Sequence, residues 1–273
     1  MSGHAITRRD LIGAVATSVS GLMLAACGSS PDTAPGDTDG APYALVSEGT
    51  LTCVSDMAFP PMDYMDGDTC TGYEVELMEA IAAKMGLECV WLPPTKFDTI
   101  IPLIKQGGKA DVGASSFTIT DERKEEVDFT NAYLDSNQGV ATLKSASVKD
   151  EGDLDAEGKR IAVQSGTTGE MWAQENLTKA TIVSLDDPVQ AMAGMSTGLY
   201  DAVAADLPVV SYLCTQSYTD CEVSLEIPTG EQYGLVVSKD NPALTEALNE
   251  AYEAVVADGT EAKLQEKWFG AEL

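Results

Sequence analysis

The chain has 273 residues and a formal net charge of −28 at pH 7, with 44 acidic side chains against 16 Lys and Arg. Binding to a nucleic-acid backbone depends on clustered Lys and Arg, so this composition excludes that class and no nucleic acid is expected as a partner. The length is enough for one large domain or two smaller ones.

The N-terminus has the layout of a secretory signal, because Arg8 and Arg9 precede a weakly apolar run and small residues precede Cys27. The run is shorter than the ~20 apolar residues that a membrane-spanning helix needs. Its ending, Leu-Ala-Ala-Cys, resembles the bacterial lipoprotein box. This predicts a signal peptide over residues 1–26 and a lipid on Cys27; the alternative is an ordinary signal peptide with a chance cysteine. The arginine pair also resembles a twin-arginine export signal, but Leu11 stands where Phe is usual, so the export route stays open.

Residues 27–42 are expected to carry the lipid and to form a flexible tether. They are rich in Gly, Pro, Ser and Asp and have no periodic apolar positions, so they cannot bury enough surface to fold. About fifteen such residues span roughly 20 Å. We therefore expect the folded part to stay outside the cytoplasm, lipid-anchored to the cell membrane, at the cell surface or in the periplasm. The type of cell envelope stays open.

Removing residues 1–26 takes away two of the 16 Lys and Arg residues, one of the 44 acids and the single histidine. The remaining chain therefore has 14 basic residues, 43 acidic residues and no histidine. Ser-His-Asp and Cys-His catalysis are excluded, and so are most zinc sites. No metal and no other cofactor is expected.

Five cysteines follow Cys27, and an odd number leaves at least one thiol unpaired or bonded to another molecule. Cys214 and Cys221 bracket a short polar segment, so a loop disulfide between them is expected. The pairing stays open for the other three, which are Cys53, Cys70 and Cys89.

Short apolar strands alternate with amphipathic helices in the first half of the folded part. Such repetition favours a mostly parallel sheet with helices on both faces. In the predicted helix Gly72–Met85, apolar residues recur at helical spacing, and two glutamates lie in the first turn, where the helix dipole favours negative charge. The other predicted elements are strands over Leu51–Val54, Leu87–Leu92 and Ala110–Ser115 and a helix over Phe97–Lys105.

The same alternation begins again in the second half and continues to the C-terminus. Asn241 is expected to cap a helix that Pro242 opens and that Asp258 and Gly259 end. The other predicted elements are strands over Arg160–Gln164, Ile182–Ser184 and Ala202–Ala205, and helices from Glu170, over Val189–Thr197 and over Thr260–Trp268.

Two extended runs, Gln138–Lys144 and Tyr233–Val237, lie between the halves. Two crossings predict that the chain leaves a first lobe, builds a second lobe and returns. The predicted fold is therefore α/β with two lobes and a hinge of two crossover strands. Residues 43–137 plus 238–273 form the first predicted lobe, and residues 138–237 form the second.

Polar and aromatic side chains follow the predicted strands, at the sheet edge where ligands bind in open α/β folds. Hydroxyls donate single hydrogen bonds and a guanidinium donates two in parallel, a combination that suits an anion. The candidates in the first half are Asp56 and Phe59 after the first strand and Ser115, Ser116, Thr118 and Arg123 after the third.

In the second half, Gln164 ends a strand, and Thr167 and Thr168 begin a helix whose free backbone N–H groups bind carboxylates readily. Asp206 follows another strand and faces the same cleft by topology. The sequence therefore predicts one cleft built from strand ends of both lobes.

Several candidates also have a purely structural interpretation. Asp56 would be a capping residue and Phe59 a core residue. Arg123 would form surface ion pairs with its acidic neighbours, and Asp206 would be a turn residue before Leu207 and Pro208.

Several segments, in order along the chain, resemble the extracellular amino-acid-binding proteins of ABC importers. The resemblance covers the chain from about Leu51 to Gly270 and implies the two-lobed, type II periplasmic-binding-protein-like fold. The segments that carry it are GYEVELMEAIA at residues 72–82, DFTNAY at 128–133, LYDAV at 199–203 and DGTEAKLQEKWF at 258–269.

The resemblance also implies which part of the ligand each candidate residue contacts. Arg123 would bind the α-carboxylate and Asp206 the α-ammonium group. Met62, which stands where Phe is usual, and Gly113-Ala114, which replaces a bulkier pair, leave the ligand's identity open. Hydrogen bonds to the α-carboxylate would also come from Ser116, Thr118, Thr167 and Thr168. Phe59 and Phe97 would form aromatic walls around the ligand side chain. Asp56 would contact the far end of the ligand, and Gln164 would help to select its side chain.

The main hypothesis is a monomeric binding protein, not an enzyme, that captures an amino acid and delivers it to an ABC permease in the cytoplasmic membrane. Asp56, Gln164 and the acidic surface favour a polar or basic amino acid such as arginine, lysine, histidine or glutamine. One alternative is a cyclohexadienyl or prephenate dehydratase-like enzyme on the same fold, which would not need Asp206 beside Arg123. Another is a ligand-sensing subunit that passes ligand occupancy to a receptor. Without a predicted transmembrane helix, such signalling would be less direct.

Overall fold

The computed structural model describes residues 42–271. The predicted signal peptide over residues 1–26, the lipidation site at Cys27 and the tether up to residue 41 lie outside the described residues. Within residues 42–271, no helix combines the length and the apolar character needed to cross a membrane.

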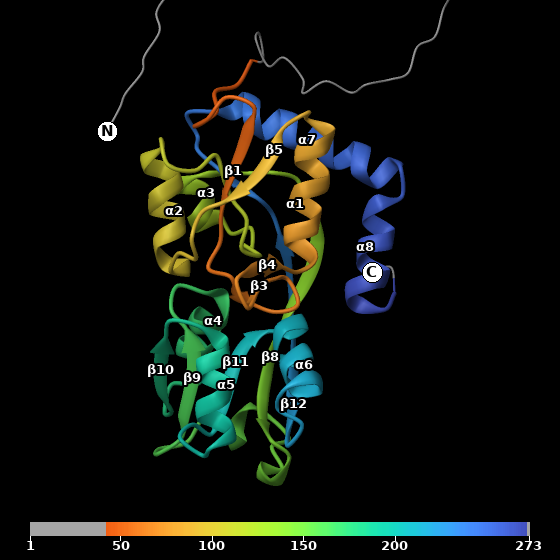
Figure 1. Ribbon diagram of the computed structural model, residues 1–273. Coiled ribbons are helices and arrows are strands. Elements are labelled where there is room, and N and C mark those ends of the chain that lie inside the picture. The colour runs from red at the N-terminus through yellow and green to blue at the C-terminus, as the bar shows by residue number, and fades with distance from the viewer. Residues whose placement is uncertain (1–41, 272–273) are drawn as a thin grey trace, which may run out of the picture. The chain divides into compact units, whose positions relative to one another are not determined.

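The first lobe is built on a five-stranded sheet in the order β5-β1-β6-β13-β7. β1 pairs in parallel with β5 and β6, whereas β13 pairs antiparallel with β6 and β7. In Figure 1, α1 and α2 flank this sheet on opposite sides. The strands are β1 (Thr50–Val54), β5 (Glu88–Trp91), β6 (Val112–Gly113), β7 (Asp128–Phe129) and β13 (Val236–Val237). The helices are α1 (Tyr73–Lys84), α2 (Phe97–Gln106), α3 (Asp121–Glu126), α7 (Pro242–Ala257) and α8 (Thr260–Phe269).

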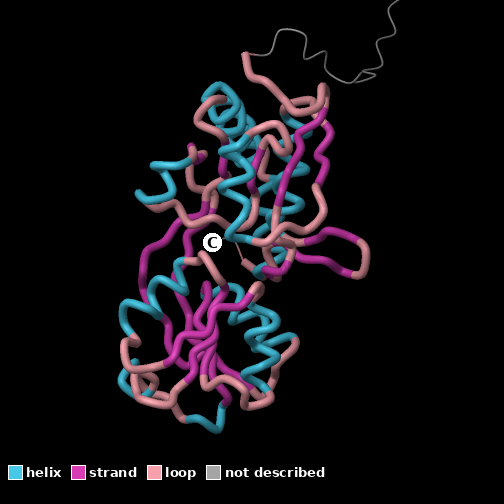
Figure 2. The backbone as a smooth tube through the Cα atoms, turned by 90° about the vertical axis from the view of Figure 1, so that its left-hand side faces the viewer, coloured by secondary structure: helices cyan, strands magenta, loops and turns pink. Residues whose placement is uncertain are grey.

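The second lobe repeats this plan with a sheet in the order β10-β9-β11-β8-β12. β9 pairs in parallel with β10 and β11, and β8 pairs antiparallel with β11 and β12. Figure 2 shows this sheet in its lower part, with helices on both sides. The strands are β8 (Leu134–Leu143), β9 (Arg160–Gln164), β10 (Thr181–Leu185), β11 (Ala202–Asp206) and β12 (Cys221–Tyr233). The helices are α4 (Thr168–Asn176), α5 (Pro188–Ser196) and α6 (Leu207–Gln216), with two 3-10 turns at Lys144–Ala146 and Glu151–Asp153.

The two-lobed α/β fold expected from the sequence is confirmed, and several predicted elements match to within a residue or two. In each sheet three neighbouring strands are parallel, β5-β1-β6 in the first and β10-β9-β11 in the second. The strands next to them, β13 and β8, are antiparallel. The sequence patterns did not reveal α6, most of β12, or a small antiparallel sheet beside β1. That third sheet consists of β2 (Ala58–Phe59), β3 (Asp63–Asp66) and β4 (Thr69–Thr71).

The lobes are joined by β8 and β12, which pair with each other along the crossing. Leu134 lies opposite Tyr233, and Ser136 opposite Glu231, before the register shifts between Glu231 and Ile227. The predicted crossing at Tyr233–Val237 and the lobe boundary after residue 237 need correction, because Val236 and Val237 pair with β6 and β7 in the first sheet. That run is broken at Gly234, where an added Cβ would lie 2.9 Å from the side chain of Ile119, so strand pairing changes partners there.

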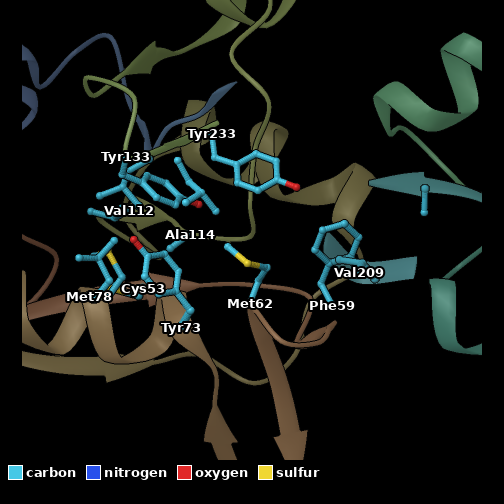
Figure 3. Packing of buried hydrophobic residues seen from close by; sticks show 14 of the residues in the cluster. Cys53, Phe59, Met62, Tyr73, Met78, Val112, Ala114, Tyr133, Val209 and Tyr233 are labelled. Carbon is cyan, nitrogen blue, oxygen red and sulfur yellow. The ribbon is translucent and has the colours of Figure 1, made fainter. Parts of the chain in front are cut away.

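Three tyrosines, Tyr73, Tyr133 and Tyr233, belong to one hydrophobic core cluster, which Figure 3 shows from close by. The ring centroids of Tyr73 and Tyr133 are 6.4 Å apart, and those of Tyr133 and Tyr233 are 6.1 Å apart. Met62 is fully buried in the same cluster. These contacts join α1 of the first lobe to the last residue of β12, so the core of the first lobe supports the hinge.

The expected disulfide between Cys214 and Cys221 is not formed. Both are free thiols, like the other three cysteines in residues 42–271, and both are buried. Burial and the neighbouring Cys221 raise the pKa of the Cys214 thiol to about 11. The two thiols therefore lie near each other, in one core cluster, without forming a bond.

Gly72, at the start of α1, has a backbone conformation that other residues rarely adopt, with φ 136° and ψ 171°. An added Cβ would lie 2.1 Å from the carbonyl oxygen of Met62. We expect Gly72→Ala to destabilise the protein by more than about 3 kcal/mol in urea denaturation, because backbone strain and a backbone clash add. Gly67→Ala, at φ 62° with nothing within 4 Å, serves as the control and costs only about 1 kcal/mol. Equal effects of the two variants would contradict this explanation.

Candidate ligand-binding cleft

The strand ends of the two lobes face each other at the crossing. Asp56 follows β1 and Thr118 follows β6, whereas Gln164 ends β9 and Asp206 ends β11. Direct hydrogen bonds join the lobes here: Gln164 Nε2 donates to Asp56 Oδ2 at 2.6 Å, and the Thr118 and Thr168 hydroxyl oxygens lie 3.4 Å apart. The lobes are therefore in contact on the side where the sequence predicted a cleft.

Arg123 is buried at the centre of this contact, with 6% of its surface exposed. It donates from one N–H group to the Thr118 carbonyl at 2.8 Å and from another to the Gly166 carbonyl of the second lobe at 3.0 Å. The guanidinium carbon lies 5.4 Å from the centroids of both Phe97 and Phe117, which stack on each other at 4.5 Å. The alternative interpretation of Arg123 as a surface ion pair is therefore wrong.

Burial lowers the pKa of Arg123, while the charges of Asp206 and Glu231 oppose that shift. A guanidinium keeps its proton at physiological pH even so. Because a buried cation is costly without partners, the polar groups around Arg123 are expected to include anions. Asp206 and Glu231 meet that expectation.

Asp206 lies at the end of β11 and is 4% exposed. Its Oδ1 accepts a hydrogen bond from Gln138 Nε2 at 2.7 Å, and its Oδ2 accepts one from the Tyr233 hydroxyl. Burial, and then the nearby charge of Glu231, raise the pKa of Asp206 to about 6, while its hydrogen bonds and Arg123 act in the other direction. Asp206 makes no capping hydrogen bond to α6, so a turn role does not account for it.

Glu231 enters the cleft from β12 and was not among the predicted site residues. Its Oε2 accepts hydrogen bonds from Thr118 Oγ1 at 3.0 Å, Thr168 Oγ1 at 2.9 Å and Gln138 Nε2 at 2.9 Å. Three donors from both lobes therefore converge on one carboxylate oxygen. Thr167, the residue before Thr168, directs its hydroxyl elsewhere, to the Gln164 carbonyl at 2.8 Å, and caps α4.

Asp56 and Gln164 form the other end of the contact. Besides Gln164, Asp56 accepts hydrogen bonds from the Ala58 N–H at 3.1 Å and the Ser115 hydroxyl at 3.2 Å. The Ala58 contact agrees in part with the capping interpretation, although the bond from Gln164 crosses between lobes. Burial raises the pKa of Asp56, and these hydrogen bonds lower it. An exposed ion pair between Lys96 and Asp186, with 2.7 Å between Nζ and Oδ2, also links the lobes.

The hydroxyl of Ser116 is placed differently from its predicted role, and Phe59 packs in the core. Ser116 has a left-handed backbone, with φ 50°, and its N–H and hydroxyl donate to Glu74 Oε2 at 2.8 and 3.2 Å. Its hydroxyl thus points to a buried acid of the first lobe. Phe59, which is 6% exposed, packs in the same core cluster as Met62, whereas Phe97 belongs to the separate cluster around Arg123 and Phe117.

Beneath Asp56, the first lobe buries two further carboxylates, Asp63 and Glu74, which are both 0% exposed. Glu74 Oε1 accepts a hydrogen bond from the Tyr133 hydroxyl at 2.7 Å. Burial and the charge of Glu74 raise the pKa of Asp63 well above its usual value. Within residues 42–271, no group of three or more His, Cys, Asp or Glu side chains is placed to hold a metal ion.

Comparison with known proteins assigns the chain to a family. Residues 51–271 match the bacterial extracellular solute-binding proteins, family 3. The chain belongs to this family. The L-cystine-binding protein TcyJ of Escherichia coli (strain K12) is 30% identical over 82% of this chain and 84% of its own length. The ABC transporter arginine-binding protein 1 of the same organism is 34% identical over 77% of this chain and 87% of its own length.

Among solved structures, the ancestral amino acid-binding protein AncCDT-1, a precursor of cyclohexadienyl dehydratase, superposes with a TM-score of 0.76. It is 33% identical, and the match covers 81% of this chain and 96% of the other. Membership of the family and this superposition agree with the two lobes described above.

Sequence reasoning missed Gln138, Glu231 and Tyr233, which all lie on the crossover strands β8 and β12. It also missed Phe117, which was passed over among the hydroxyl residues after β6. The search followed strand ends, whereas a crossover strand passes through the cleft in mid-strand. A polar residue within a predicted crossing, such as Gln138, is the signal that would have found them.

The raised pKa of Asp206 predicts a pH-dependent stability. The folded protein binds the proton of the Asp206 carboxyl group more tightly than the unfolded chain does, so ionisation of Asp206 lowers the stability of the fold. This cost is complete above pH 6 and decreases as the pH falls toward 4. Glu231, Arg123, Tyr233 and Gln138 face this carboxyl group. Asp206→Asn loses one of the two hydrogen bonds that Asp206 accepts at either pH. We therefore expect its stability relative to the wild type, measured by urea denaturation without ligand, to be about 2 kcal/mol more favourable at pH 8 than near pH 4.

Glu246→Gln, at an exposed carboxylate on α7, is the matched control and should change little at either pH. If Asp206→Asn destabilises the protein equally at pH 8 and pH 4, the raised pKa does not govern its contribution.

Proposed function

We propose that this protein binds an amino acid between its lobes and delivers it to an ABC permease. The observation that carries the proposal is the presence of Arg123 and Asp206, two buried groups of opposite charge, where the lobes meet. A zwitterion that leaves water needs a partner for each of its charges, and this contact offers one of each. Because the partners come from both lobes, ligand binding favours closure.

The α-carboxylate would lie against Arg123, Thr118 and Thr168. A guanidinium has five N–H donors in a fixed fork, and Arg123 uses two of its N–H groups on backbone carbonyls. The two threonine hydroxyls already donate to a carboxylate, that of Glu231, so their geometry suits this group. The α-ammonium group would take Asp206, whose pKa of about 6 leaves it ionised at pH 7.

The ligand side chain would extend toward Asp56 and Gln164, which are hydrogen-bonded to each other across the lobes. A carboxylate and an amide favour a polar or basic side chain. Asp56 and Asp206 outnumber Arg123, the single buried Lys or Arg among residues 42–271, which adds to the preference for a positive ligand. We therefore propose arginine, lysine, histidine or glutamine.

A binding role is proposed in preference to an enzymatic one. The similarity to a precursor of cyclohexadienyl dehydratase keeps a prephenate dehydratase-like enzyme as the alternative. Such a substrate lacks the α-ammonium group, however, and it would leave Asp206 buried without a cationic partner. A ligand-sensing subunit would use the same cleft and would differ only in its partner.

Calorimetry with the twenty amino acids tests the binding role. We expect at least one polar or basic amino acid to bind with micromolar affinity, which needs about 8 kcal/mol. Arg123→Ala and Asp206→Ala are each expected to weaken binding by at least about 2 kcal/mol, because each leaves one ligand charge unpaired. The control is Lys179→Ala, which removes an ion pair with Asp155 that lies within the second lobe and does not link the lobes. Binding of none of the amino acids, or undiminished binding by both clamp variants, would refute the proposal.

We further propose that the protein acts as a monomer held at the membrane by a lipid on Cys27, without a cofactor. In cells, we expect the wild type to partition into a detergent phase and Cys27→Ser to move to the aqueous phase or the medium, because one thioether carries the lipid. Cys70→Ser, a cysteine in the folded part, is the control. If Cys27→Ser stays with the membrane fraction, the anchor lies elsewhere.

A further inference from the structure

We propose that Glu231 is an internal competitor for the ligand's carboxylate, so that ligand binding exchanges one carboxylate for another. The inference rests on the proposed amino-acid site and adds a residue that restrains it. Glu231 belongs to β12, a crossover strand, and neither the strand ends nor the pattern of candidate residues pointed to it.

The first argument is geometric. A single oxygen, Glu231 Oε2, accepts hydrogen bonds from Thr118 of the first lobe and from Thr168 and Gln138 of the second, at 2.9–3.0 Å. Two of these donors are the hydroxyls proposed to bind the ligand's α-carboxylate. An incoming carboxylate and that of Glu231 therefore cannot both accept these hydrogen bonds.

The second argument concerns closure without ligand. Arg123 donates to the Gly166 carbonyl, and Gln164 donates to Asp56, so groups proposed for the ligand bond directly to the opposite lobe. The charge of Glu231, after that of Asp206, opposes the lowering of the Arg123 pKa by burial, so Glu231 also supplies negative charge to this region. The protein can thus close on its own carboxylate, with the same donors that would close it on a ligand.

The third argument is that Glu231 is held at a cost. Its carboxylate and that of Asp206 share the same donor, Gln138 Nε2, at 2.9 and 2.7 Å. Like charges this close repel each other, and the charge of Glu231 contributes to the raised pKa of Asp206. A ligand that brings an ammonium group to Asp206 while its carboxylate displaces Glu231 relieves this repulsion. A simple carboxylic acid would not.

The fourth argument is that Glu231 has space to leave. It follows Gly230, at φ 64°, where the register of β12 against β8 shifts. A cavity of about 440 Å³ opens beside it, lined in part by Ser136, Leu207 and Pro208. The side chain can therefore turn out of the cleft into this cavity while β12 keeps its pairing.

The test compares Glu231→Gln and Glu231→Ala with the wild type by calorimetry, using each amino acid that the screen identifies. Both variants are expected to bind at least about tenfold more tightly, the change that one charge-assisted hydrogen bond is worth. The matched control is Glu226→Gln, which removes an exposed carboxylate from the same strand and should bind as the wild type does. Small-angle scattering of the ligand-free proteins should show a larger radius of gyration for the Glu231 variants only.

The outcomes separate the two proposals. If the wild type binds an amino acid and the Glu231 variants show the same affinity and the same radius of gyration, the proposal of an internal competitor is overturned. The proposed amino-acid site is then unaffected. Weaker binding by both variants also overturns it and makes Glu231 a ligand contact. If neither the wild type nor any variant binds an amino acid, the proposed site fails and the competitor fails with it. Thermal unfolding of each variant verifies that it is folded.

Discussion

The buried guanidinium of Arg123 sets the constraint on which the rest of the cleft depends. A cation that is 6% exposed needs anions and hydrogen-bond acceptors around it, and both lobes supply them. The first lobe gives a backbone carbonyl and two stacked rings, and the second gives another carbonyl. The carboxylates of Asp206 and Glu231 complete the surroundings. Contact between the lobes is thus tied to the balance of charge between them.

The fold places these groups through its strand ends and its crossings. Strand ends contribute Asp56, Gln164 and Asp206, while the paired crossover strands carry Gln138 and Glu231 through the middle of the site. Tyr233 connects the two systems, because it ends β12, packs on the core of the first lobe and donates to Asp206. A change in the angle between the lobes therefore alters the surroundings of the charged groups directly.

The sequence allowed the lobes, most of the central strands and the candidate residues at strand ends to be predicted, because buried apolar runs and helix caps are local signals. β9 and the start of α7 at Pro242 are examples. The rest depends on contacts distant in the chain. β12 contains many polar residues, so only its last residue lay in a predicted strand. Glu231 was therefore missed together with the rest of β12. The disulfide expected from the spacing of Cys214 and Cys221 is not formed, because spacing in sequence fixes neither the distance nor the geometry that a disulfide needs.

The central claim is that the same two hydroxyls, those of Thr118 and Thr168, bind a carboxylate in both states: that of Glu231 without ligand and that of an amino acid with it. A crystal structure of the protein grown with its best-binding amino acid tests this most directly. The account predicts the ligand's α-carboxylate on Arg123 and both threonines, its ammonium group on Asp206, and Glu231 turned away from Thr118. A ligand whose carboxylate lies elsewhere, with Glu231 still hydrogen-bonded to Thr118 and Thr168, would contradict it.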